Sequence, residues 1–142
     1  MGGVCRDPEV HCFVWRSPLY LATHARLVSS SNPTVDVTIH NLDLGSLLME
    51  LLIFSLRMAP LAHIQRYINN TVSQEWAHRG SVSTASSVEP ILWELSLLDM
   101  QQHTHTSIGR VPGEDNKMLD VASRLTHLPD QQFISHFCAH FP

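Results

Sequence analysis

Residues 110–125, RVPGEDNKMLDVASRL, carry the most information about the fold. Their first residues end an alternating, strand-like run, and Pro112-Gly113 predicts a turn. Asp115 is a favourable N-cap for a helix that follows this turn. Apolar residues recur at helical spacing on the expected inner side of that helix: Met118, Val121, Ala122 and Leu125. The stretch therefore predicts a strand, a turn and a helix that presents the carboxylate of Asp120 in its first turns.

The rest of the chain alternates between short strands and helices. Residues 2–5 and 12–15 are β-prone and predict a hairpin. A long helix is predicted by leucines at helical spacing: Leu44, Leu47, Leu48, Leu51, Leu52 and Leu56. The remaining predicted elements are a strand over 64–68, a helix over 71–79 capped by Thr71, a helix over 88–102 and a strand over 104–110. Helices that separate strands predict an α/β fold with a partly parallel sheet.

Composition narrows the class of protein. The chain has 142 residues, 44% apolar and 15% charged, which suits one ordinary domain and excludes a disordered chain. Its net charge of −4, with nine Lys plus Arg, predicts only weak affinity for nucleic acid. The longest apolar run, residues 47–56, is about half the length of a membrane span, so we expect no membrane association. Three cysteines without a CxxC pair, and no apolar signal core, favour an intracellular location, cytoplasm or nucleus.

Three segments, taken in order, resemble the ribonuclease H-like domain of retroelement reverse transcriptases. The family's pattern G-x-D-N-x-x-A-D-x-x-S-R is matched at Gly113, Asp115, Asn116, Asp120, Ser123 and Arg124. Residues 67–73, YINNTVS, resemble the family's D-N-T-A-A strand end, and residues 39–44, IHNLDL, resemble its I-N-x-L-E-L helix start. Residues 1–4 resemble its second strand. The resemblance covers about Met1 to Leu128.

This resemblance implies a fold and an ancestral reaction. The fold is a ribonuclease H-like mixed sheet flanked by helices, and the reaction is hydrolysis of the RNA strand of RNA–DNA hybrids. Two Mg²⁺ ions, or Mn²⁺, assist that reaction, and several carboxylates must converge to hold them. The family's carboxylate positions correspond here to Asp120, Asp43 and Asn69.

The departures from the family pattern indicate an incomplete metal site. Asp43 replaces a glutamate and is one methylene shorter, and Asn69 replaces an aspartate and brings no charge. The first aspartate is expected on a strand before Met1. Asp120 and Asp43 are therefore metal ligands only if the chain is active, and otherwise no cofactor is expected. The missing strand would be central, so its loss exposes a sheet edge and predicts self-association.

Three functions follow from this pattern. The first is a non-catalytic remnant of a retroelement ribonuclease H domain that binds RNA–DNA hybrid weakly. The second is an active ribonuclease H, completed by an upstream segment. The third is an interaction protein that uses the same scaffold, with the sheet edge and an apolar tail as its surface. In each case residues 1–128 form the truncated domain, and residues 129–142 form a tail of uncertain order.

Simpler interpretations exist for each singled-out residue. Asp120 is also a favourable acid near a helix N-terminus, while Asp43 suits a helix start and Asn69 suits a turn. His136, Cys138 and His140 are residue types that bind zinc, although an H-x-C-x-H spacing is a weak zinc signal.

Overall fold

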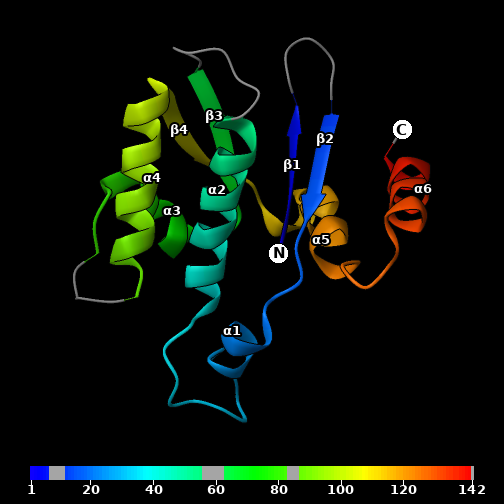
Figure 1. The fold of residues 1–142 in the computed structure, drawn as a ribbon, viewed down its shortest axis with the longest axis horizontal. Coiled ribbons are helices and arrows are strands. Elements are labelled where there is room, and N and C mark those ends of the chain that lie inside the picture. Colours follow the sequence, from blue (N-terminus) through cyan, green and yellow to red (C-terminus); the bar gives the residue numbers. More distant parts are fainter. Residues whose placement is uncertain (7–11, 56–62, 83–86, 142) are drawn as a thin grey trace. The chain divides into compact units, whose positions relative to one another are not determined.

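The computed structural model describes residues 1–6, 12–55, 63–82 and 87–141. The chain divides into two compact units. Unit 1 combines Met1–Leu21 with Pro112–Pro142, and unit 2 is Ala22–Val111. Figure 1 shows helices and short strands in both, which confirms a mixed α/β composition.

Unit 1 begins with the predicted hairpin. Strands β1 (Gly2–Arg6) and β2 (Cys12–Arg16) pair antiparallel, with Gly3 opposite Trp15. Glycine is required at position 3 because the Trp15 indole covers it: a Cβ there would lie 2.1 Å from Trp15 Nε1. At position 2, a Cβ would lie 2.8 Å from the backbone of Ala122. The two glycines thus let β1 approach its neighbours closely.

Two helices complete unit 1 and bury its apolar side chains. They are α5 (Lys117–Arg124), which packs on β1, and α6 (Asp130–His140). Ala122, Phe133 and Phe137 are buried at the centre of the core. The four residues predicted for the inner side of the helix all belong to it: Met118, Val121, Ala122 and Leu125. That prediction is confirmed. Most of the C-terminal tail is helix α6, and its phenylalanines are core residues.

Unit 2 contains a parallel strand pair joined through helices. In chain order its elements are α1 (Leu21–Ala25, which begins at the last residue of unit 1), α2 (Ile39–Ser55), β3 (His63–Ile68), α3 (Thr71–Arg79), α4 (Glu89–Gln102) and β4 (His105–Arg110). β3 and β4 run parallel, as a helical crossover requires. Helices α2 and α4 pack on each other (Figure 1), and both contribute leucines to one core with Ile64 and Ile68.

In the part of the chain that is described, the strands pair as β1–β2 within unit 1 and as β3–β4 within unit 2. Two expectations about helix caps differ from the structure. Asp115 does not cap α5, because it lies in a 3₁₀ turn and Asn116 holds the N-cap position. Asn70, and not Thr71, caps α3, because its amide oxygen accepts hydrogen bonds from the backbone N–H groups of Val72 and Ser73.

The helices within residues 1–6, 12–55, 63–82 and 87–141 are all too short or too polar to cross a membrane.

Candidate functional site: the polar cluster around Asp43

The residues predicted at the family's carboxylate positions fall in both units. Asp43 is in α2 and Asn69 directly follows β3, both in unit 2, whereas Asp120 is in α5 of unit 1. The most extensive polar network around these residues surrounds Asp43. We define it as the Asp43 cluster, which consists of His40, Asp43, Asn70 and Ser73.

The start of α2 fixes the position of this cluster. Asn41 is buried, and its side-chain oxygen accepts hydrogen bonds from the backbone N–H of Thr38, at 2.9 Å, and from the Thr38 hydroxyl, at 2.5 Å. This is half of a capping box: the third helical residue satisfies the N–H of the residue before the helix. The Asn41 amide also donates to the Ser87 hydroxyl at 2.8 Å, which ties α2 to the segment before α4.

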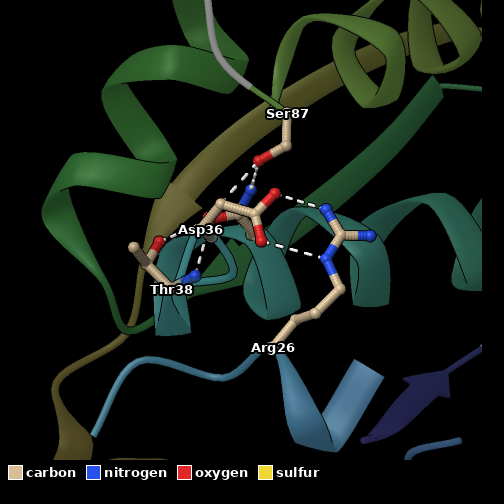
Figure 2. Close-up of polar contacts among 5 residues, drawn as sticks. Arg26, Asp36, Thr38 and Ser87 are labelled. Atoms are coloured by element: carbon tan, nitrogen blue, oxygen red, sulfur yellow. Dashed lines mark hydrogen bonds and ion pairs between the residues drawn. The ribbon is translucent and has the colours of Figure 1, made fainter. Parts of the chain in front are cut away.

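The segment that precedes α2 is held by hydrogen bonds that continue from Asn41 through Ser87 to Asp36 (Figure 2). Ser87 Oγ is 3.5 Å from the carbonyl oxygen of Asp36, and the Asp36 carboxylate forms an ion pair with Arg26. That ion pair is exposed and holds the pKa of Asp36 below its usual value. The N-terminal turn of α2 therefore has a defined position from which Asp43 projects.

Hydrogen bonds join the members of the Asp43 cluster between α2 and the capped start of α3. Asn70 Nδ2 lies 2.6 Å from His40 Nδ1, within hydrogen-bond distance. Ser73 is fully buried, and its hydroxyl lies 3.4 Å from the carbonyl oxygen of His40 and 3.5 Å from Asp43 Oδ2. Trp76 closes one side, with its ring edge-on to His40 at a centroid distance of 5.6 Å.

Burial dominates the electrostatics of Asp43. It raises the pKa of the carboxyl above its ordinary value, and the hydrogen bond from Asn70, the charge of His40 and the hydrogen bond from Ser73 only partly oppose it. A raised carboxyl pKa means that the folded state disfavours the charged form. The contribution of Asp43 to stability is therefore lost as pH rises through its folded pKa.

Asn69 occupies a different environment from its neighbour. Its side chain is exposed at the end of β3, whereas Asn70 turns into the cluster beside His40. The sequence pattern pointed to Asn69 and missed His40, Asn70 and Ser73. Two signals were available: Asn70 directly precedes a helix, and His40 lies three residues before Asp43 and so on the same helix face.

Asp120 lies on the surface of α5. Its Oδ1 accepts a hydrogen bond from Arg124 Nε at 2.8 Å, one helical turn later, and both side chains are exposed. The Ser123 hydroxyl donates to the backbone carbonyl of Asp120 at 3.0 Å. The last three matched positions of the family pattern thus interact locally, as a surface helix pair does.

The oxygen donors of each unit fall short of what two Mg²⁺ ions require. Asp43 is the one carboxylate of its cluster in the described chain, and Asn70 and Ser73 already donate hydrogen bonds to it. Asp120 forms an exposed ion pair with Arg124. No three His, Cys, Asp or Glu side chains gather into a metal-binding group in the part of the chain that the structure describes. Neither set by itself fits a pair of hard cations, which require several converging carboxylates.

Exchange of Asn70 for alanine tests the cluster directly. We expect Asn70→Ala to lower the free energy of unfolding by about 0.5–2 kcal/mol, because α3 loses its N-cap. The same change removes a hydrogen bond that lowers the pKa of Asp43, so that pKa should rise further. Chemical denaturation and carboxyl NMR titration measure the two effects.

Asn69→Ala is the matched control, one residue away on an exposed position. It should change stability by less than about 0.5 kcal/mol and leave the Asp43 pKa unchanged. Equal effects of the two substitutions would show that the Asn70 contacts contribute nothing.

Comparisons of the chain with known protein families, with curated proteins and with solved structures gave no match.

Proposed function

We propose that the chain is a non-catalytic remnant of a retroelement ribonuclease H domain. The proposal rests on one observation above all. The family-like segments occur in the family's order, yet the residues at its carboxylate positions are Asp120, Asp43 and an uncharged, exposed Asn69. Such a set supplies too little negative charge to neutralise two divalent cations beside a phosphate.

The local surroundings of the carboxylates support this reading. The Asp43 carboxyl is disfavoured in its charged form by burial, and Asp120 is bonded to Arg124. Loss of partners that merely orient a metal ligand costs about 10–100-fold in affinity or activity. Replacement of a charged ligand itself should cost more.

A cleavage assay tests the proposal. We expect the purified full chain to leave the RNA strand of an RNA–DNA hybrid intact in the presence of Mg²⁺ or Mn²⁺. Asp120→Ala is the control, because Asp120 is the one of the three carboxylate positions whose residue type matches the family pattern. Metal-dependent cleavage by the parent chain that is lost in Asp120→Ala would contradict the proposal.

A second candidate is an active ribonuclease H completed by a segment encoded upstream. Each unit of the described chain holds a two-stranded sheet, which favours this candidate, because a pair of strands is marginal by itself and gains stability from a third. The upstream reading frame should then encode an apolar strand that carries an aspartate. Co-expression with that segment should restore hybrid cleavage, and a frame without such a strand would exclude this candidate.

The third candidate, an interaction protein, uses the same sheet edges without catalysis. It predicts self-association or partner binding through the backbone of an edge strand. Sizing over a range of concentrations separates it from the first: a remnant that elutes as a monomer at all concentrations would argue against self-association.

A further inference from the structure

Helix α6 brings two histidines together on one face. His136 and His140 are four residues apart, and their ring centroids lie 4.3 Å apart with an interplanar angle of 31°. Both side chains are exposed. Cys138 is exposed on the same helix but lies about 200° around the axis from His136. The helix therefore separates the thiol from the imidazoles, and the H-x-C-x-H segment becomes a two-histidine pair.

The hydrogen bond within the pair leaves a nitrogen available for a ligand. His140 Nδ1 lies 2.9 Å from the carbonyl oxygen of His136. A carbonyl only accepts, so Nδ1 carries the proton and Nε2 keeps its lone pair. Histidines that bind metals commonly donate their other ring nitrogen to a backbone carbonyl in this way.

The position of the pair on α6 also favours a cation. His140 is the last residue of the helix, where the backbone dipole is negative. The same helix is anchored in the core of unit 1 by Phe133 and Phe137, which are both buried. The two imidazoles are thus presented by a helix that is already fixed, and binding does not have to order it.

We propose that His136 and His140 chelate a transition-metal ion such as Ni²⁺, Zn²⁺ or Cu²⁺. Imidazole nitrogen suits these ions, whereas Mg²⁺ prefers carboxylate and carbonyl oxygen. The protein supplies two ligands, and water fills the remaining positions, so the ion exchanges readily. This site is independent of the proposed ribonuclease H ancestry, because it uses neither Asp43 nor Asp120.

A second histidine pair offers an internal comparison in unit 2. His63 and His105 are opposite each other on β3 and β4, with ring centroids 5.2 Å apart. His63 Nε2 is 2.6 Å from the Ser107 hydroxyl, so that this nitrogen is already engaged. We therefore expect the pair on α6 to bind the metal more tightly.

The test is a Ni²⁺ titration of the full, reduced chain, followed by amide NMR. Paramagnetic Ni²⁺ should broaden the resonances of residues 136–140 at the lowest metal concentrations, and diamagnetic Zn²⁺ should reverse the broadening while excess Mg²⁺ should not. His136→Gln should weaken the apparent affinity at α6 by more than about tenfold. Cys138→Ser and His63→Gln should leave it unchanged.

A variant with the same number of histidines tests whether metal binding depends on the four-residue spacing of His136 and His140. Ser135→His combined with His136→Ser, both in the Cys138→Ser background, keeps the number of histidines but moves one imidazole about 100° around the helix, away from His140. The Cys138→Ser change is included because an imidazole at position 135 would otherwise lie beside the thiol. The combined variant should bind Ni²⁺ at α6 as weakly as His136→Gln does. The proposal is overturned if broadening at α6 is absent in the parent chain, persists at full affinity in either histidine variant, or is lost in Cys138→Ser.

Discussion

Replacement of Arg66 with methionine should lower the free energy of unfolding of unit 2 by about 3 kcal/mol or more. Arg66 is 3% exposed on the buried face of β3, and its Nη1 donates to the carbonyl oxygen of Leu47 at 3.3 Å. Its charge acts on Glu50, one turn further along α2. Methionine keeps most of the apolar volume, so the loss measured is chiefly electrostatic.

The pKa of Glu50 explains the sign and the pH dependence of this effect. Burial raises it above its ordinary value, and the charge of Arg66 lowers it only in part. Without Arg66 the pKa should rise further, and the ionised carboxylate becomes costlier in the folded state. Because the folded state then binds the proton more tightly than the unfolded state, the stability deficit should shrink as pH falls through the folded pKa of Glu50.

Two further variants make the measurement specific. Arg79→Met removes an exposed ion pair with Glu75 on α3 and should cost at most about 1 kcal/mol. In Arg66→Met combined with Glu50→Gln, the added pH dependence should vanish, since the titrating group is gone. Urea denaturation between mildly acidic and neutral pH measures the free energy of unfolding of all three variants. An Arg66→Met deficit no larger than that of Arg79→Met would refute a buried electrostatic role.

The sequence predicted the elements well because their signals are local. Leucine spacing located α2 and α4, β-prone runs located the hairpin, and the helical face of Met118 and Ala122 proved to be the core face of α5. Alternation also places Arg66 on the same face of β3 as Ile64 and Ile68. What alternation cannot reveal is the compensating charge on another element, because that depends on how α2 packs against β3.

The candidate site was less predictable, because its contacts also depend on how separate elements pack together. Motif matching selected Asn69, but the residue that turns toward Asp43 is Asn70, because a helix N-cap must direct its side chain at the following N–H groups. Capping of α5 failed as a prediction because Gly113–Asp115 first form a 3₁₀ turn, which displaces the cap by one residue to Asn116. Both errors are one residue in sequence, and at α3 that residue decides which asparagine side chain joins the Asp43 cluster.

Phe133→Ala should lower the free energy of unfolding of unit 1 by about 3–5 kcal/mol. Phe133 is 4% exposed and packs with Phe137 and Ala122 in the core, at a ring centroid distance of 5.7 Å from Phe137. The Arg16 guanidinium lies over its ring, 4.3 Å from the centroid. Arg16 also donates to the carbonyl oxygens of Leu125 and Leu128 and pairs with Asp130 at 2.7 Å. Loss of the ring therefore opens a cavity and removes the surface that holds Arg16 in place.

Ile134→Ala is the matched control on the next residue of α6. Ile134 is 54% exposed, so its truncation should cost less than about 1 kcal/mol. The comparison decides whether the C-terminal segment is a dispensable tail or part of the core. If α6 belongs to the core, Phe133→Ala should shift the denaturation midpoint well beyond Ile134→Ala and should expose the β1–β2 amides to hydrogen exchange. If the two variants unfold alike, α6 does not stabilise unit 1, and residues 129–142 behave as a tail.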